Sequence, residues 1–177
     1  FLLDASGSFH FLEFNPGLQD EHGVTEMRTG LDLVELQLNL AAGESLPDQA
    51  LRATTSGYAM EARIFAEPPG TDDSAAAEAT SLGEVKELRW PNIPPGQLRV
   101  ETVLQPNTTV TADHGPLLAK LIAFGPTRHR ALLLLDRTLA ETELSPITNN
   151  LTKLRKVLNH ECFRAGQYDT EFIERSL

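Results

Sequence analysis

The chain has 177 residues, of which 41% are hydrophobic, so it is long enough for one well-buried domain or two small packed units. Its 15 Lys and Arg against 25 Asp and Glu give a formal net charge of −10, which argues against a nucleic-acid partner. A single cysteine excludes an internal disulfide framework and a multi-cysteine zinc site. No apolar run approaches the roughly 18 residues of a membrane-spanning helix, so we expect no membrane association.

The first four residues, Phe-Leu-Leu-Asp, are typical of the middle of a strand. They carry no initiator methionine, no basic region and no small-residue cleavage site. We therefore expect a segment of a longer protein, with any targeting signal upstream. The expected location is cytoplasmic, and a mitochondrial one stays open for the same reason.

Residues 1–15 predict a β-hairpin, because apolar runs with aromatic residues two apart flank a turn-rich segment. Residues 32–42 predict a helix that ends at Gly43. Its predicted buried stripe consists of Leu31, Val34, Leu38 and Ala41.

Alternating apolar and polar residues predict a second strand over residues 58–67, with Glu61 and Arg63 on one face. Residues 68–80 have no sustained apolar period and predict a surface excursion. Further strands are expected over residues 84–90, 98–104 and 117–124. Helices follow: one capped by Thr127, one with its apolar stripe over residues 147–158, and a short one near Phe172. Strands at hairpin-like spacing with helices grouped late indicate an α+β fold with a mainly antiparallel sheet.

The densest polar group of the sequence is Glu13, Asn15, Gln19, Glu21 and His22. A carboxylate and an amide two residues apart on one strand face are hard oxygen donors that suit Mg²⁺, especially when substrate phosphates complete the coordination. On the residues alone, a strand end with solvated polar side chains is the alternative. No second histidine lies at metal-binding spacing, so His22 is expected to be a hydrogen-bonded loop residue.

The run over residues 9–27, FHFLEFNPGLQDEHGVTEM, resembles the signature of the biotin carboxylases, ATP-grasp enzymes with the approximate pattern F-Y-F-L-E-M-N-P-R-L-Q-V-E-H-P-V-T-E. Further similar segments follow in order over nearly the whole chain: residues 30–34, 41–44, 57–67, 98–102, 117–122, 148–150 and 170–173. Residues 88–91 and 98–102 look most like the urea carboxylase branch, which includes the carboxylase part of urea amidolyase. Acyl-CoA and pyruvate carboxylases share the same module and are the alternative.

The resemblance implies that residues 1–45 are the C-terminal end of an ATP-grasp domain and residues 46–177 a biotin carboxylase C-terminal domain. In this family ATP and bicarbonate give carboxyphosphate, whose breakdown supplies CO₂ to biotin. The implied cofactors are ATP, Mg²⁺ or Mn²⁺, and biotin on a carrier domain. The implied partners are that biotin carboxyl carrier domain, an N-terminal ATP-binding half and a second copy in a homodimer. The segment alone is expected to be inactive.

The resemblance also assigns roles to single residues. Glu13 matches a metal ligand, and Asn15 lies where the family has a further metal-site residue. Gln19 matches the residue that orients bicarbonate, and Glu21 matches the general base that deprotonates it. Arg63 matches the arginine that stabilises the biotin enolate.

Two further positions carry smaller expectations. Arg99 matches a position near the dimer interface of the family. Lys120 is expected to end a strand and to make no contact with substrate.

The departures from the family pattern gather around the anion site. Gly17 stands where the family has a bicarbonate-binding arginine, Asp20 replaces an apolar residue, and Gly23 replaces a proline, which should loosen the loop. Residues 68–80 replace another family segment. These changes keep open a second hypothesis, in which the chain is a catalytically degenerate scaffold or dimerisation module.

Overall fold

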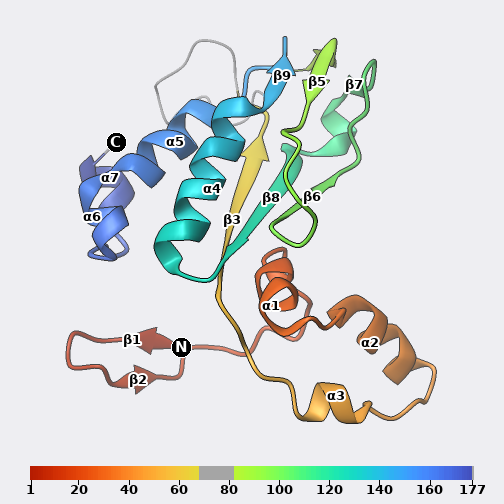
Figure 1. The fold of residues 1–177 in the computed structure, drawn as a ribbon, viewed down its shortest axis with the longest axis vertical. Helices are drawn as coiled ribbons and strands as arrows, with labels where there is room; N and C mark the ends of the chain where they lie inside the picture. The colour runs from red at the N-terminus through yellow and green to blue at the C-terminus, as the bar shows by residue number, and fades with distance from the viewer. Residues whose placement is uncertain (68–81, 177) are drawn as a thin grey trace.

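The structure is a computed structural model that describes residues 1–67 and 82–176 (Figure 1). The elements in chain order are β1 (Leu2–Leu3), β2 (Phe9–His10), α1 (His22–Thr29), α2 (Leu33–Ala41), α3 (Asp48–Leu51), β3 (Tyr58–Phe65), β4 (Gly83–Glu84), β5 (Glu87–Arg89), β6 (Leu98–Thr102), β7 (Thr109–Val110), the 3-10 helix η2 (Ala112–His114), β8 (Leu117–Gly125), α4 (Arg128–Glu141), β9 (Glu143–Ser145), α5 (Leu151–Asn159), α6 (Glu161–Ala165) and α7 (Phe172–Ser176). The predicted surface excursion over residues 68–80 lies outside the described residues.

The largest sheet in the described part of the chain has three strands in the order β3-β8-β6, and both pairings are antiparallel. Three two-stranded sheets accompany it: β1-β2, β4-β7 and β5-β9. This mixture of helices and antiparallel sheets confirms the predicted α+β class. None of the helices in the described residues combines the length and the apolar character that crossing a membrane requires.

One face of the three-stranded sheet packs against α4, which lies along β3 and β8 (Figure 1). Period-2 alternation turns Ala62 and Ile64 of β3 toward this side, where both are buried in the core. From α4, Leu132 and Leu135 enter the same core and are almost fully inaccessible to water. Burial of each large aliphatic side chain contributes about 1.5–3 kcal/mol to stability, so this layer supports the fold.

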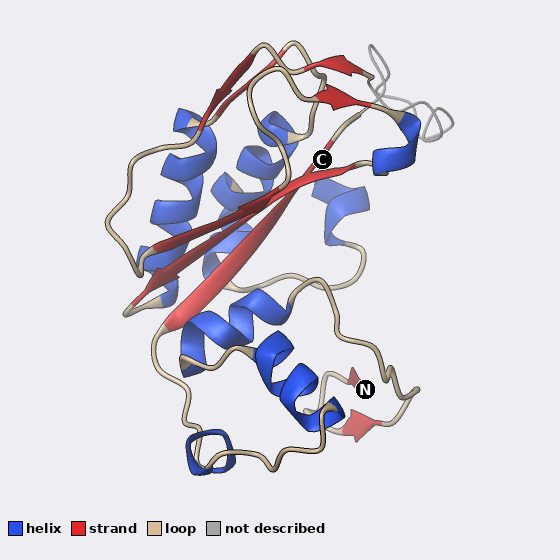
Figure 2. Cartoon of the chain, turned by 90° about the vertical axis from the view of Figure 1, so that its right-hand side faces the viewer, coloured by secondary structure: helices blue, strands red, loops and turns tan. Residues whose placement is uncertain are grey.

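The predicted capping of α4 is confirmed, because the hydroxyl of Thr127 accepts a hydrogen bond from the amide of Arg130 at 3.2 Å. The hairpin over residues 1–15 is also confirmed, although β2 ends at His10 and residues 11–15 belong to no strand. Figure 2 shows this hairpin and the N-terminal helices in the lower part of the molecule, below the long strands of the sheet.

The opposite face of the sheet is covered by α1, which packs on β3 and β8. Gly23 lies in the first turn of α1 and is buried there, so the prediction that it loosens a loop was wrong. A β-carbon at Gly23 would lie 2.3 Å from Cδ1 of the fully buried Ile122. Glycine therefore lets this helix approach the sheet closely.

Two other predictions, on the burial of α2 and on the position of Lys120, were wrong. The predicted stripe on α2 is not buried: Val34 and Leu38 are exposed, because no described element covers that face of the helix. Lys120 lies in the middle of β8, where neighbouring strands pair with it on both sides, and does not end a strand. The pattern also missed α3, β7, η2, β9 and α6, which are short elements with little periodicity.

Candidate functional site

The site begins where the loop before α1 reaches the end of β3. Glu21 is the residue before the first turn of α1, and its carboxylate lies 3.0 Å from the guanidinium of Arg63 on β3. Asp20 reaches the same guanidinium nitrogen at 3.7 Å. The Arg63 side chain is 40% exposed, so this cation is paired with two carboxylates and still open to solvent.

The fold thus brings together Glu21 and Arg63, which the sequence analysis assigned as base and enolate-stabilising arginine. The guanidinium carbon of Arg63 also lies 5.7 Å from the ring centroid of Phe65, which favours one orientation of the cation. A carboxylate that can accept a proton beside a fixed positive charge suits proton abstraction from an anionic substrate.

A hollow of about 650 Å³ opens in front of this loop, and its lining includes Asn15, Gly17, Gln19, Glu21 and His22. Three residues with predicted site roles, Asn15, Gln19 and Glu21, therefore face one cavity. A β-carbon at Gly17 would meet no atom within 4 Å, so the position has room for a larger side chain.

The predicted metal residues lie at the start of the same loop. The amide of Asn15 donates to the carboxylate of Glu13 at 3.5 Å, and both residues are exposed. Among the described residues no cluster of three or more His, Cys, Asp or Glu could hold a metal. Two oxygen donors nevertheless fit Mg²⁺, which commonly keeps several waters and binds through one or two carboxylates plus substrate phosphates.

Six charged residues lie between α1 and the sheet and are called the charged layer here. They are Glu26 of α1, Glu61 and Arg63 of β3, Arg99 and Glu101 of β6, and Lys120 of β8. The strand register places Arg63, Lys120 and Glu101 in one row across the three strands. Within this layer Lys120 pairs with Glu101, and Arg99 pairs with both Glu26 and Glu101.

Two carboxyl groups of the charged layer have shifted pKa values of opposite sign. Burial raises the pKa of Glu61, and neither of its carboxylate oxygens has a hydrogen-bond partner among the described residues. Burial also acts to raise the pKa of Glu101, but the hydrogen bond from Lys120 and the charge of Arg99 outweigh it and hold that pKa below its ordinary value. Glu101 is therefore the anionic centre of the layer.

Two side chains donate hydrogen bonds to backbone carbonyl groups of the loop before α1. The ring nitrogen Nδ1 of His22 donates to the carbonyl oxygen of Gln19 at 2.9 Å, which confirms the predicted hydrogen bond, although His22 is the first residue of α1 and not a loop residue. The ammonium of Lys120 donates to the carbonyl oxygen of Asp20 at 2.8 Å. The two accepting carbonyl groups belong to the two residues that immediately precede Glu21.

Arg99 is placed differently from a free surface arginine. It lies on β6, an edge strand of the three-stranded sheet, and its side chain is 37% exposed. Two carboxylates within the chain already pair with it. Its position near a dimer interface stays a prediction.

The charged layer as a unit was not predicted from the sequence. Glu26, Glu61 and Glu101 had no assigned role, although charged residues two apart in residues 61–63 and 99–101 put acids and bases on one strand face. That alternation was the available signal.

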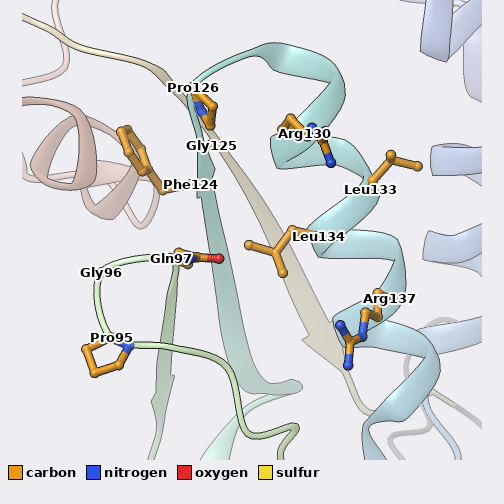
Figure 3. A pocket seen from close by; sticks show the side chains of 10 residues that line it. All are labelled: Pro95, Gly96, Gln97, Phe124, Gly125, Pro126, Arg130, Leu133, Leu134 and Arg137. Atoms are coloured by element: carbon orange, nitrogen blue, oxygen red, sulfur yellow. The ribbon is translucent and has the colours of Figure 1, made fainter.

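A second hollow, of about 730 Å³, lies away from this site between the end of β8, one face of α4 and the loop before β6 (Figure 3). Its walls combine Phe124, Leu133 and Leu134 with the arginines Arg130 and Arg137. Arg137 donates to Glu141 within α4 at 2.7 Å. The hollow contains none of the predicted site residues.

Comparison with known families gives two matches. Residues 61–175 match the biotin carboxylase C-terminal domain, and residues 1–49 match the ATP binding domain of the carbamoyl-phosphate synthase L chain.

Several curated proteins are similar along almost the whole chain. A biotin carboxylase of Halalkalibacterium halodurans is 39% identical over 99% of the chain, which spans 37% of that protein. The mitochondrial methylcrotonoyl-CoA carboxylase subunit alpha of Oryza sativa is 38% identical over 99% of the chain, which spans 23% of that protein. The chain thus corresponds to about a third or less of these relatives.

Solved structures give the same result. The biotin carboxylase domain dimer of the Hydrogenobacter thermophilus 2-oxoglutarate carboxylase, in complex with MgADP, ADP and bicarbonate, matches 98% of the chain and 37% of its own, with a TM-score of 0.85 and 31% identity. The Kluyveromyces lactis urea carboxylase matches 94% of the chain and 14% of its own, with a TM-score of 0.83 and 35% identity.

Proposed function

The chain belongs to the biotin carboxylase family, and we propose that it is the C-terminal portion of an ATP- and bicarbonate-dependent biotin carboxylase. The observation that carries the proposal is the pair of Glu21 and Arg63, held 3.0 Å apart beside a hollow that Gln19 also lines. In this proposal residues 1–45 are the end of an ATP-grasp domain and residues 46–177 the biotin carboxylase C-terminal domain.

Each site residue then has a distinct task. Glu21 accepts the proton of bicarbonate, which becomes a better nucleophile as the proton leaves. Gln19 orients that anion through its amide. Arg63 supplies a fixed positive charge where negative charge develops during transfer of the carboxyl group. When bound, ATP with Mg²⁺ would supply the phosphoryl group that activates bicarbonate, and biotin on its carrier domain would be the acceptor of the carboxyl group.

Glu13 and Asn15 would hold the Mg²⁺ or Mn²⁺ of the nucleotide, together with its phosphates. Both side chains are exposed and 3.5 Å apart, so no other protein group has to be displaced. Rotation of the Asn15 amide by half a turn presents its oxygen in place of its nitrogen. This arrangement suits a metal that keeps most of its ligands from water and phosphate.

An N-terminal ATP-binding half is proposed as a partner because residues 1–51 expose many large apolar side chains. Phe1, Phe9 and Phe14 are each at least 75% exposed, and Leu38 of α2 is 66% exposed. Soluble proteins seldom leave contiguous apolar surface of this kind open to water. A covering ATP-binding portion would bury it, and the segment alone would then be inactive.

A homodimer is proposed on the side of the sheet that ends in β6. Arg99 is still partly exposed there, and the hollow of Figure 3 reaches the loop that leads into β6 and has Phe124 and Leu133 in its lining. Aromatic and aliphatic side chains beside arginines are typical of interface centres.

For the acceptor of the carboxyl group we propose urea or a closely related amide, because residues 88–91 and 98–102 look most like that branch. The 35% identity with the Kluyveromyces lactis urea carboxylase supports the proposal. The 38% identity with a methylcrotonoyl-CoA carboxylase subunit favours an acyl-CoA acceptor as the alternative.

Two observations favour a second function, that of a degenerate scaffold or dimerisation module. Asp20 places a carboxylate 3.7 Å from Arg63, and Gly17 supplies no guanidinium for a substrate anion. Both features disfavour binding of bicarbonate, because they add negative charge and remove a donor.

The deciding experiment measures ATP cleavage by the full-length protein as a function of both bicarbonate and biotin. Cleavage that requires both supports the carboxylase, and Glu21→Gln should abolish it. In an enzyme weakened at the anion site, Gly17→Arg should raise the rate by about 10²–10³, the worth of one preorganised donor.

Gly17→Leu is the matched control, since it adds bulk to the same open space without a donor. A folded protein that binds Mg-ATP, yet cleaves none with bicarbonate and biotin and gains nothing from Gly17→Arg, would support the scaffold and refute the carboxylase.

A further inference from the structure

Lys120 is a buried cation that faces the candidate site from the centre of the sheet. Its backbone pairs with Arg63 on one side and Glu101 on the other, and only 8% of the residue is exposed. Taking an ammonium out of water is costly unless it is paired and hydrogen-bonded, so its partners are the reason that it can lie there.

Those partners come from two different parts of the chain. The Lys120 ammonium pairs with the carboxylate of Glu101 on β6, and it also donates to the carbonyl oxygen of Asp20 at 2.8 Å. Asp20 lies 100 positions away in the sequence, in the loop before α1. The lysine therefore ties the loop to the three-stranded sheet.

The tie acts next to the proposed base. Before Asp20, the carbonyl of Gln19 accepts from the amide of His22 at 3.1 Å, and after it the carbonyl of Glu21 accepts from the amide of Val24 at 3.1 Å. These two bonds close local turns, whereas the bond from Lys120 joins this backbone to the sheet. Arg63, which pairs with Glu21, lies opposite Lys120 in that same sheet.

We propose that Lys120 is a positioning residue that holds the Glu21 carboxylate in register with Arg63 through the Asp20 carbonyl. This inference rests on the proposed function, in which Glu21 is the general base. Glu101 fixes the direction of the ammonium, so that one proton of the amine points to the sheet edge and another to the loop. The amine touches neither substrate nor metal in this role.

The expected effect follows from how strictly catalysis depends on position. A displacement of about 1 Å at a reacting group can lower a rate by about 100-fold. Lys120→Met keeps a stem of comparable length but removes the donor to the Asp20 carbonyl. We therefore expect kcat for bicarbonate- and biotin-dependent ATP cleavage by the full-length protein to fall by about 100-fold, with KM for ATP unchanged.

Loss of the cation also leaves Glu101 without one partner, so a second variant separates stability from position. Lys120→Met combined with Glu101→Gln removes both charges, and this double variant should melt closer to wild type than Lys120→Met. Its kcat should stay low, because the Asp20 carbonyl still lacks its donor. Lys153→Met is the matched control, since Lys153 pairs with Glu67 at 3.1 Å on the exposed side of α5.

Amide hydrogen exchange gives a readout that does not depend on activity. Exchange of the His22 and Val24 amides, which donate to the carbonyl oxygens of Gln19 and Glu21, should be faster in Lys120→Met and in the double variant, and unchanged in Lys153→Met. Wild-type exchange there in either Lys120 variant would overturn the proposal. A wild-type kcat in Lys120→Met would overturn it too. So would a double variant in which kcat recovers together with the melting temperature. A wild-type protein without bicarbonate- and biotin-dependent cleavage would refute the proposed function instead, and exchange would still test the tie.

Discussion

Removal of the Glu26 side chain should destabilise the protein far more than removal of an exposed glutamate that also pairs with an arginine. Glu26 joins three elements: one carboxylate oxygen accepts from the amide of Leu33 at 2.7 Å at the start of α2, and the other pairs with Arg99 on β6. Its side chain is 4% exposed, so both interactions are shielded from water on the acid side.

The magnitude follows from these two hydrogen bonds to a charged group, each worth about 1.5–3 kcal/mol. The bond to Arg99 counts for less, because that side chain is 37% exposed and keeps Glu101 as a partner. We expect Glu26→Ala to cost about 3 kcal/mol, and hence to lower the melting temperature by about 6–12 °C. Glu26→Gln can still accept from the Leu33 amide and should cost about half as much.

The matched control is Glu143→Ala, which breaks the pair with Arg89 between β5 and β9. Both of those side chains are more than half exposed, so no resolvable change in the urea midpoint is expected. The assay is equilibrium urea unfolding followed by circular dichroism, with thermal scans of the same variants. If Glu26→Ala and Glu143→Ala lowered the free energy of unfolding equally, burial would not determine how much each ion pair stabilises the protein.

Two further predictions concern the face of the sheet that α1 covers. Gly23→Ala should cost about 1–3 kcal/mol through overpacking against Cδ1 of Ile122. Ile122→Val deletes that atom and should recover part of the loss in the double variant; strictly additive effects would contradict the contact. Burial raises the pKa of Glu61 above 4.5, so the native state binds this proton more tightly than the unfolded state. The stability that this group contributes is full below pH 4.5 and is lost as pH rises through the raised pKa. The urea midpoint of Glu61→Gln should therefore be higher than that of wild type above neutral pH and similar to it below pH 4.5. The same difference in midpoint at both pH values would exclude titration of Glu61 as the cause.

The local patterns of the sequence predicted most of the architecture. Alternation in residues 58–67 was enough to place Glu61 and Arg63 on one face of β3, and the opposite face, with Ala62 and Ile64, is the buried one, because side chains of a strand alternate strictly between its two faces. The cap at Thr127 was predictable for a similar reason, since a hydroxyl at that position satisfies an amide only three residues away.

The same patterns failed wherever burial depends on a distant element. The stripe of Val34 and Leu38 has the right spacing for a buried helix face, yet both residues are exposed because no described element covers it. Periodicity reports that a face is apolar, and it carries no information about what packs against that face.

The candidate site was likewise predictable in part. Family motifs in the sequence already contained Glu13, Asn15, Gln19, Glu21 and Arg63, and Gly17 was visible as a departure. Which cation meets which anion was decided only by the folded chain: Lys120 reaches the Asp20 carbonyl across 100 positions, and Arg99 reaches Glu26 across 73. Spacing along the chain places a charge on a strand face, but a hydrogen bond of about 3 Å also needs the second backbone to arrive there, and only packing of α1 on the sheet brings it.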